Sequence, residues 1–509
     1  MPEFTSSTPP KNPPSSFKET IDSLIIAFIL AFVFRAFGVE AFVIPTGSMA
    51  DTLRGAHFRL TCPTCSYQFN YGFLSKQYGY PEGVIPRQAV NITSGKFDPG
   101  GIPLCPICGT KIDTNRPYRV SNGDRILVLK YIYHFIEPQI WDVVVFKNPE
   151  KPSQNFIKRL IGRPGETIEI IDGDVYLKTD EDGPAQIQRK PDHIQQTLWI
   201  PAYVSDYQPA PETPGARNHL VWDEPFKPEN GSAWEVDCRR HKLEFHEAEQ
   251  LDRLEFNPRR IRKLTQCFAA YNGDRTEDSA IVSDLKLEFV LIPHRETGAV
   301  AVMLGKYGRI YRADINFDGA CSITSEYNDE VLKSQQFEPL SPQRPIKVSF
   351  ALVDHTLKLR LGNNRLDYTG PDDPAAWGYH HDPKARFPSV TLAGKTGSFT
   401  LKQVALYRDV HYTNSSGSSL PGRGTEGDPF KLEQNEFFVL GDNSPQSHDS
   451  RFWDEPGLGN GRDSYTPGVV PRDYLLGRAL FVYWPGGFYP HSRIPFAVIP
   501  NVGDMRFIH

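Results

Sequence analysis

The sequence predicts a mainly β protein that is anchored by one N-terminal transmembrane helix and interrupted by two inserted units. The chain has one long apolar run, near its N-terminus, and then many short apolar stretches separated by turns. Its 44 prolines and 40 glycines among 509 residues favour turns and strands over helical bundles. A net charge of −5 gives no basic excess, so we expect no nucleic-acid partner.

The N-terminal segment divides into a tail and an apolar helix. Residues 1–20 are rich in Pro, Ser and Thr, which predicts a disordered tail. Residues 21–39 would form a helix about 28 Å long, close to a bilayer core of about 30 Å. A cleaved secretory signal is the alternative, but Val39-Glu40-Ala41 is a poor cleavage site. Lys11 and Lys18 favour an N-terminus in the cytoplasm, with the rest of the chain outside it.

Residues 40–60 supply a candidate nucleophile, Ser48, which follows Thr46 and Gly47 at the end of a short apolar strand. A serine hydroxyl is a weak nucleophile at neutral pH and needs a base. None of the 14 histidines lies in a recognisable triad motif, and His57 follows Ser48 too closely to be assigned. A Ser48 without a catalytic role is the remaining alternative.

Residues 61–118 predict an inserted zinc-ribbon-like unit, because two CxxC motifs lie in them: Cys62 with Cys65, and Cys105 with Cys108. Each motif can turn two thiolates towards one ion, and together they complete a tetrahedral site typical of structural Zn²⁺. Two disulfides are the alternative, because we expect this segment in an oxidising compartment. The total of seven cysteines excludes a fully paired disulfide framework within one chain.

Residues 119–198 return to a β pattern and contain a candidate base, Lys158. Side chains alternate between the two faces of a strand, so Lys158 shares a face with Phe156 and Leu160. Apolar neighbours can lower a lysine pKa from about 10.4 by several units, and a fall of about 3 units corresponds to roughly 4 kcal/mol. An uncharged Lys158 could then activate Ser48.

Residues 199–425 contain repeated short strands separated by turns, for example 284–292, 346–352 and 356–361. This pattern predicts an inserted antiparallel β-sandwich, and it faintly resembles concanavalin-like and laminin-G-like modules. The resemblance implies a glycan or protein ligand, and a spacer role is the alternative. Residues 426–509 then return to the core with an apolar strand, Gly441-Asp442-Asn443 and a polar loop up to Arg451.

In this order, the pieces resemble the bacterial type I signal peptidases, which are membrane-anchored Ser/Lys endopeptidases. Residues 40–49, 141–146, 157–166 and 441–451 carry the resemblance. It covers about a third of the chain. Thr46, Asp51, Trp141 and Ser444 depart from the residues usual in the family, but none of these departures removes a chemical group that the mechanism needs.

The resemblance implies a role for each site residue and no cofactor for catalysis. Ser48 would attack the scissile carbonyl and form an acyl-enzyme, with Lys158 as the general base and Ser447 orienting its amine. The Thr46 hydroxyl and the Ser48 N–H would form the oxyanion hole. The remaining assignments are a stabilising salt bridge between Asp449 and Arg451, and substrate pockets shaped by Phe42, Ile44 and Ile157.

We therefore expect a serine endopeptidase that removes N-terminal signal peptides from exported preproteins. Its expected place is the bacterial cytoplasmic membrane, in contact with the lipid bilayer, with the catalytic domain on the outer side. The alternative is a membrane-anchored glycan- or protein-binding module with an inactive peptidase core. The presence of Ser48, Lys158 and Ser447 argues against that alternative.

Overall fold

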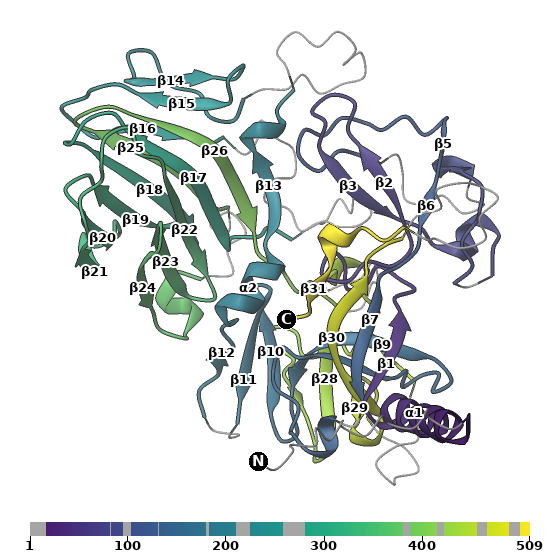
Figure 1. The fold of residues 1–509 in the computed structure, drawn as a ribbon. Coiled ribbons are helices and arrows are strands. Elements are labelled where there is room, and N and C mark those ends of the chain that lie inside the picture. The colour runs from purple at the N-terminus through teal and green to yellow at the C-terminus, as the bar shows by residue number, and fades with distance from the viewer. Residues whose placement is uncertain are drawn as a thin grey trace, which may run out of the picture.

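The computed structural model confirms a mainly β chain (Figure 1). It describes residues 17–81, 83–94, 103–130, 132–179, 183–209, 224–257, 280–379, 387–414, 422–455, 466–487 and 499–509. Within these ranges the α-helices are α1 (Phe17–Phe37) and α2 (Asp192–Leu198), and most of the remaining regular structure is strand. Most of the tail that we predicted to be disordered, residues 1–16, lies outside the described residues.

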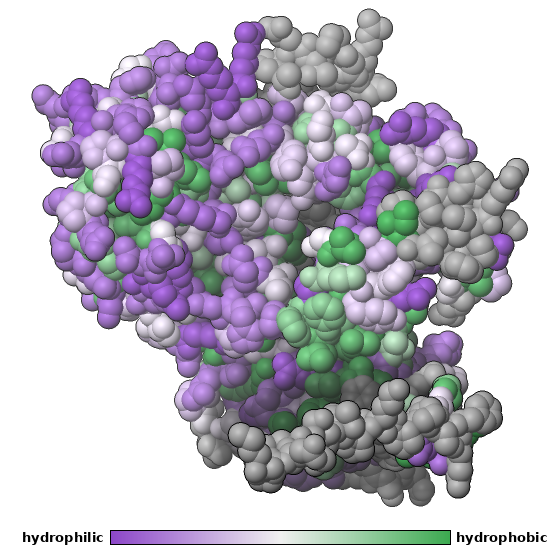
Figure 2. Space-filling view, viewed as in Figure 1, coloured by the Kyte–Doolittle hydropathy of each residue, from purple (hydrophilic) through white to green (hydrophobic). Residues whose placement is uncertain are grey.

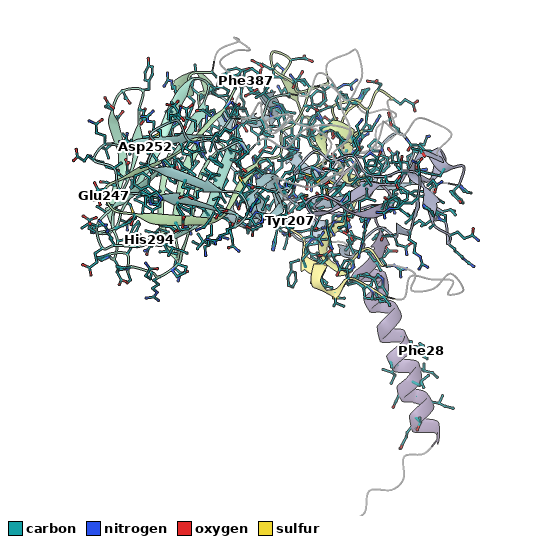
Figure 3. All side chains as sticks on the ribbon, turned by 90° about the horizontal axis from the view of Figure 1, so that it is seen from above. Phe28, Tyr207, Glu247, Asp252, His294 and Phe387 are labelled. Atoms are coloured by element: carbon teal, nitrogen blue, oxygen red, sulfur yellow. The ribbon has the colours of Figure 1, made fainter. Side chains whose placement is uncertain are left out.

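The helix α1 covers most of residues 21–39, the segment for which we predicted a transmembrane span. In the described part of the chain, no helix is both long and apolar enough to cross a membrane. Figure 3 shows α1, with Phe28 labelled, projecting away from the body of the molecule.

The core sheet joins three distant parts of the chain. Its order is β1 (Val39–Val43), β7 (Arg125–Lys130), β30 (Leu475–Trp484), β8 (Val143–Lys147), β9 (Asn155–Gly162), β28 (Glu436–Leu440) and β29 (Val470–Pro471), with β31 (Arg506–Phe507) paired to β30. Neighbouring strands of this sheet run antiparallel, for example β1 against β7 with Phe42 opposite Ile126. The strands that carry the candidate site are therefore neighbours in one sheet despite their separation in sequence.

A second, smaller sheet lies beside the core sheet and leads into the large insertion. Its order is β12 (Gln186–Ile187), β11 (Asp174–Lys178), β10 (Thr167–Ile171) and β27 (Phe430–Lys431). The hairpin between β10 and β11 turns at Asp172 and Gly173, whose φ angles are 47° and 87°. A Cβ on Gly173 would lie 2.2 Å from the His411 ring, so this turn requires glycine for space as well as for conformation.

Between β1 and β7 the chain forms a small unit, which we call the cysteine unit (residues 57–121). It contains β2 (His57–Thr61), β3 (Gln68–Gly72) and β6 (Val120–Ser121) in one sheet, and β4 (Val90–Asn91) paired with β5 (Pro117–Tyr118). Its apolar core is built around Phe58, Tyr71 and Phe73, each 2% exposed or less.

Asp124 ties both ends of the cysteine unit to the core. Its carboxylate accepts the Arg54 N–H at 3.0 Å, and its own N–H donates to the Arg54 carbonyl at 2.8 Å. The second carboxylate oxygen accepts the Gly486 N–H at 3.0 Å. The unit therefore leaves and re-enters the core at one point, a few residues beyond Ser48.

Residues 200–204 and 234–408 form a large unit, which we call the inserted β unit. One of its sheets has the order β14 (Trp234–Asp237), β15 (Lys242–Phe245), β26 (Phe399–Arg408), β17 (Leu285–Pro293), β22 (Ile346–Val353), β23 (Thr356–Leu361) and β24 (Asn364–Thr369), with β13 (Ile200–Val204) paired to β26. The other has the order β16 (Asp252–Glu255), β25 (Ser389–Lys395), β18 (Ala299–Lys306), β19 (Arg309–Asn316), β20 (Ala320–Ser325) and β21 (Glu330–Gln336). Buried side chains from both sheets, such as Leu287 and Val302, belong to one apolar cluster. In Figure 1 this unit lies on the left, apart from the core sheet.

Candidate active site

The side chains of Ser48 and Lys158 lie in direct contact. Ser48 follows β1 in a turn held by Met49 and Leu53, whose side chains are fully buried in the apolar core. Lys158 is on β9, and its amine Nζ lies 2.5 Å from Ser48 Oγ. The structure thus brings together two side chains that are 110 residues apart in sequence.

The surroundings of Lys158 favour its uncharged form. The side chain is 4% exposed, and its amine lies 5.4 Å from the centre of the Phe156 ring. Leu160, on the same face of β9, packs in an apolar cluster with Phe156 at its margin. Burial lowers the pKa of Lys158 from its ordinary 10.5 to about 8, although the charges of Asp449 and Asp442 act in the opposite direction.

Asn443 holds the nucleophile turn from the far end of the chain. Its backbone N–H donates to the Ser48 carbonyl at 3.0 Å, and its side-chain Nδ2 donates to the Gly47 carbonyl at 2.9 Å. We did not predict this contact. The only sequence signal is the polar turn at the end of an apolar strand, and that signal does not reveal its partner.

Gly441 makes the close approach of this turn to Ser48 possible. A Cβ added at residue 441 would lie 2.5 Å from the Ser48 carbonyl oxygen and 2.2 Å from Ser447 Oγ. Such distances are far inside van der Waals contact, so only glycine fits between the two serines.

A buried ion pair fixes the strand of the base to the same turn. Arg159 donates from Nε and Nη2 to the two carboxylate oxygens of Asp442, at 2.7 Å each. Both side chains are at most 2% exposed. Arg159 Nη1 also donates to the Trp141 carbonyl at 2.9 Å. We did not predict this pair, because nothing in the sequence near either residue indicates its partner.

Asp449 and Arg451 form the salt bridge that we expected at these positions. Arg451 donates from Nε and Nη2 to the Asp449 carboxylate at 2.9 and 2.8 Å, and neither side chain is exposed. Burial alone would raise the pKa of Asp449, but Arg451 holds it below its ordinary value. Asp449 also accepts the Gly441 N–H at 3.0 Å, so the pair supports the turn that holds Ser48.

Ser447 is completely buried between Asp449 and Gly441. Its hydroxyl helps to lower the pKa of Asp449. Within the described residues no well-formed hydrogen bond joins this hydroxyl to the Lys158 amine, which is the contact that the resemblance implied.

The predicted substrate-pocket residues are brought together in the structure. Ile44 and Ile157 belong to one buried apolar cluster, and the half-buried Phe42 packs against it. Thr46 is exposed, and its backbone is in close contact with Gly55, where a Cβ would lie 2.4 Å from the Thr46 carbonyl carbon.

The four cysteines of the two CxxC motifs also converge. Their sulfur atoms all lie within 4.8 Å of one another and are not joined as disulfides. Cys62 Sγ lies 3.5 Å from Cys108 Sγ, and Cys65 Sγ lies 3.6 Å from Cys105 Sγ. A tetrahedron with Zn–S bonds of about 2.3 Å has sulfur–sulfur edges of about 3.8 Å, so the sulfur set fits a zinc ion.

The two CxxC turns share the same backbone geometry. The Ser66 N–H donates to the Cys62 carbonyl at 3.0 Å, and the Gly109 N–H donates to the Cys105 carbonyl at 2.9 Å. Ser66 and Gly109 both adopt left-handed conformations, with φ angles of 62° and 72°. This repeated turn directs both thiols of each motif towards one point, which is the arrangement that a four-sulfur metal site needs.

Comparison with known proteins links this site to a peptidase family. The family model described as "Signal peptidase, peptidase S26" matches residues 113–209 and 390–484. Lys158 and the segment 441–451 lie inside these ranges, and Ser48 precedes them.

Three curated relatives illustrate the match. A probable signal peptidase I-1 of Synechocystis is 44% identical over 64 residues, which cover 11% of this chain and 33% of the relative. The signal peptidase I of Aquifex aeolicus is 51% identical over 49 residues, covering 10% of this chain and 19% of the relative. That of Rickettsia prowazekii is 27% identical over 167 residues, covering 33% and 45%.

These matches place the chain among the relatives of the S26 peptidases. Within that class, they confirm the resemblance to the bacterial type I signal peptidases. The chain spans less than half of the length of each of these three relatives.

Solved structures of low similarity also match the chain. The carbohydrate recognition domain of Emp46p is 12% identical with a TM-score of 0.25, and the match covers 41% of this chain and 97% of that one. The carbohydrate-binding module CBM66 of Bacillus subtilis is 12% identical with a TM-score of 0.23, and the match covers 35% and 98%. These TM-scores are too low to support an inference about a ligand.

Proposed function

We propose that this chain is a serine endopeptidase that removes N-terminal signal peptides from exported preproteins. The observation that carries the proposal is the contact between Lys158 Nζ and Ser48 Oγ in a buried, apolar setting. The matches to signal peptidases support the substrate class. A binding module with an inactive core is disfavoured, because burying a lysine amine against a serine is costly and has no evident benefit for binding.

In the proposed mechanism, Lys158 acts as the general base. Its uncharged amine accepts the proton of the Ser48 hydroxyl while Ser48 Oγ attacks the carbonyl carbon of the scissile peptide bond. The protonated amine then gives this proton to the leaving amine, and an acyl-enzyme remains on Ser48. Lys158 next takes a proton from a water molecule, whose oxygen attacks the ester carbonyl. The protonated amine then returns this proton to Ser48 Oγ as the bond to the acyl group breaks, which restores the hydroxyl and the uncharged amine.

The same proposal assigns the protein groups that would contact the oxyanion and the substrate side chains. The Ser48 N–H and the Thr46 hydroxyl would stabilise the negative oxygen of the tetrahedral intermediate. The apolar cluster that holds Phe42, Ile44 and Ile157 lies next to Ser48 and is suited to small apolar substrate side chains. Ser447, with the Asp449–Arg451 pair, would act on Lys158 through the turn at Gly441.

We also propose that the chain works at a lipid surface, on the outer side of the bacterial cytoplasmic membrane. Apolar side chains on α1 are between 42% and 57% exposed, and they are Ile21, Leu24, Ile25, Ile26, Phe28 and Ile29. A further apolar area lies over β30 and β31 (Figure 2), where Phe507 is 61% exposed. Exposed apolar groups of this extent are unusual for a surface that faces only water.

The two insertions have separate proposed roles. We propose that the cysteine unit binds one structural zinc ion through Cys62, Cys65, Cys105 and Cys108, since four protein ligands leave no open position for chemistry. We propose that the inserted β unit is an antiparallel β-sandwich of the concanavalin or laminin-G kind. The domain division remains part of the proposal, with core parts at 40–60, 119–198 and 426–509 and insertions at 61–118 and 199–425.

A preprotein cleavage assay in detergent or lipid tests the proposed activity. We expect the native chain to cleave at the end of the signal peptide, and the variants Ser48→Ala and Lys158→Ala to be inactive. Lys151→Ala, which changes an exposed lysine in the loop between β8 and β9, is the matched control and should cleave normally. A Lys158→Ala variant with normal turnover would exclude the proposed base.

A further inference from the structure

The four-cysteine cluster lies where the cysteine unit meets the inserted β unit. Val204, the last residue of β13, packs against the buried cysteines together with Tyr67 and Phe69. β13 is the strand through which the chain enters the inserted β unit. The cluster is therefore covered in part by a residue of another unit.

An aromatic pair extends this contact. Tyr67, from the cysteine unit, meets Tyr207 with ring centres 5.0 Å apart and planes at 74°. Tyr207 ends the short helical turn η4 (Ser205–Tyr207), which directly follows β13. Figure 3 shows Tyr207 at the boundary between the inserted β unit and the rest of the molecule. β13 pairs with β26, with Val204 opposite Ala405, and β26 also pairs with β15 and β17.

The CxxC turn determines where Tyr67 lies. The Cys62 N–H donates to the Tyr67 carbonyl at 2.9 Å, so Tyr67 closes the backbone loop that also presents Cys62 and Cys65. A bound metal would crosslink this turn to the second CxxC turn, which starts 40 residues after Cys65. Without the metal, the turn that carries Tyr67 is no longer crosslinked to the second CxxC turn.

We propose that a zinc ion bound by the four cysteines fastens the inserted β unit to the cysteine unit, through Tyr67 on one side and Val204 and Tyr207 on the other. Asp124 ties the cysteine unit to the core. The metal would therefore set the position of β13 and η4 relative to the nucleophile turn. The inference rests on the proposed zinc and not on the proposed peptidase activity.

A second attachment of the inserted β unit does not involve the cysteines. Lys306, at the end of β18, forms buried ion pairs with Asp284 of the same unit and Asp174 of β11. Lys190, which precedes α2, pairs with Asp354 of the same insertion and lies 2.9 Å from Asp409. Loss of the metal should therefore loosen the contact of β13 and η4 with the cysteine unit, and it should leave the contact between the inserted β unit and β11 in place. The two attachments make the proposal testable within one molecule.

Hydrogen–deuterium exchange on the full chain, with zinc bound and after removal of zinc by a chelator, tests the proposal. Metal content is measured in the same samples. On removal we expect loss of protection in 57–72 and 200–208, and unchanged protection in β11 and in β17. In Tyr207→Ala we expect zinc to bind as in the native chain, with its removal affecting 57–72 only. Cys238→Ser, which changes a thiol outside the cluster, is the control and should behave as the native chain.

Three outcomes would overturn the proposal. Intact-mass measurement without reduction could show the loss of four thiol hydrogens, which would mean two disulfides and no metal site. Zinc could bind while its removal leaves residues 200–208 unchanged, which would leave a structural metal without the coupling. Exchange could rise equally in β11, which would mean that the metal stabilises the whole fold and not only the contact of β13 and η4 with the cysteine unit. None of these readouts depends on cleavage, so they stay distinct from a failure of the proposed activity.

Discussion

The guanidinium of Arg159 and the carboxylate of Asp442 form a two-pronged, buried ion pair that holds the candidate base and the nucleophile turn together. Arg159 directly follows Lys158 on β9, and Asp442 directly precedes Asn443, which binds the carbonyls of Gly47 and Ser48. The pair therefore links both halves of the candidate site from behind, without touching the reacting atoms.

Asp442→Asn should be strongly destabilising. Removing one partner leaves the buried guanidinium of Arg159 without its counter-charge, which typically costs about 3–5 kcal/mol. We expect urea-induced unfolding to show a loss of that size, and the double variant Arg159→Met with Asp442→Leu to recover part of it. The exposed pair of Glu247 and Arg295 is the control, and Glu247→Gln should cost less than about 1 kcal/mol. An Asp442→Asn chain as stable as the control would contradict the role of the pair.

Cleavage should depend on the deprotonation of Lys158. A general base works only when unprotonated, and burial lowers the Lys158 pKa to about 8. We expect kcat/KM to rise about tenfold per pH unit below pH 8 and to level off above it. Lys151→Ala should leave this profile unchanged. A profile that is flat between pH 6 and 8 would exclude Lys158 as the titrating group.

Lys158→Met should be inactive and more stable than the native chain at pH 7. The folded pKa of about 8 is below the ordinary 10.5, so the folded state binds fewer protons than the unfolded state. The native chain therefore gains stability as the pH rises from about 8 towards 10.5. The advantage of the variant should be on the order of 3 kcal/mol at pH 7 and should shrink by pH 10. Denaturant unfolding at the two pH values measures it, and an advantage that does not change with pH would contradict the buried amine.

Gly441→Ala should abolish cleavage, because its Cβ would press on the Ser48 carbonyl oxygen and on Ser447. The Ser48 turn must then move away from Lys158. Gly503→Ala, whose Cβ would lie 3.9 Å from Asn501 Oδ1, is the matched control and should keep its activity. The readout is turnover, with circular dichroism to show that both variants fold. Normal turnover in a folded Gly441→Ala chain would mean that this close approach is not needed.

His57 should govern acid stability and not catalysis. It is completely buried, and burial lowers its pKa to about 3 from 6.5. The folded state therefore stays unprotonated where the unfolded state binds a proton, and stability falls as the pH drops from 6.5 towards 3. His57→Asn should reduce this slope by up to about 1.4 kcal/mol per pH unit. Burial also lowers the pKa of His355 to about 3, so His355 should still contribute to the loss of stability at low pH in this variant.

Two controls separate these roles of His57. His246→Asn, in an exposed position, should leave the acid slope unchanged. Cleavage at pH 8 should persist in His57→Asn, whereas complete loss in a folded variant would reopen the possibility of a histidine base.

The sequence was informative where local pattern and chemistry coincide. Two-residue alternation placed Lys158 among apolar neighbours, and the paired CxxC motifs predicted the convergence of four sulfur atoms. It failed where a partner is distant in the sequence. The roles of Asn443 and Arg159 depend on contacts across hundreds of residues, which no local period encodes.

The 283 residues that separate Arg159 from Asp442 also have a temporal consequence. A ribosome that adds about 5–20 residues per second needs roughly 15–60 s to pass from one to the other. During that interval Ser48 and Lys158 have both been synthesised, but the turn that positions Ser48 does not yet exist. On the proposed function, a growing chain would therefore stay inactive until Asp442 and Asn443 have been made.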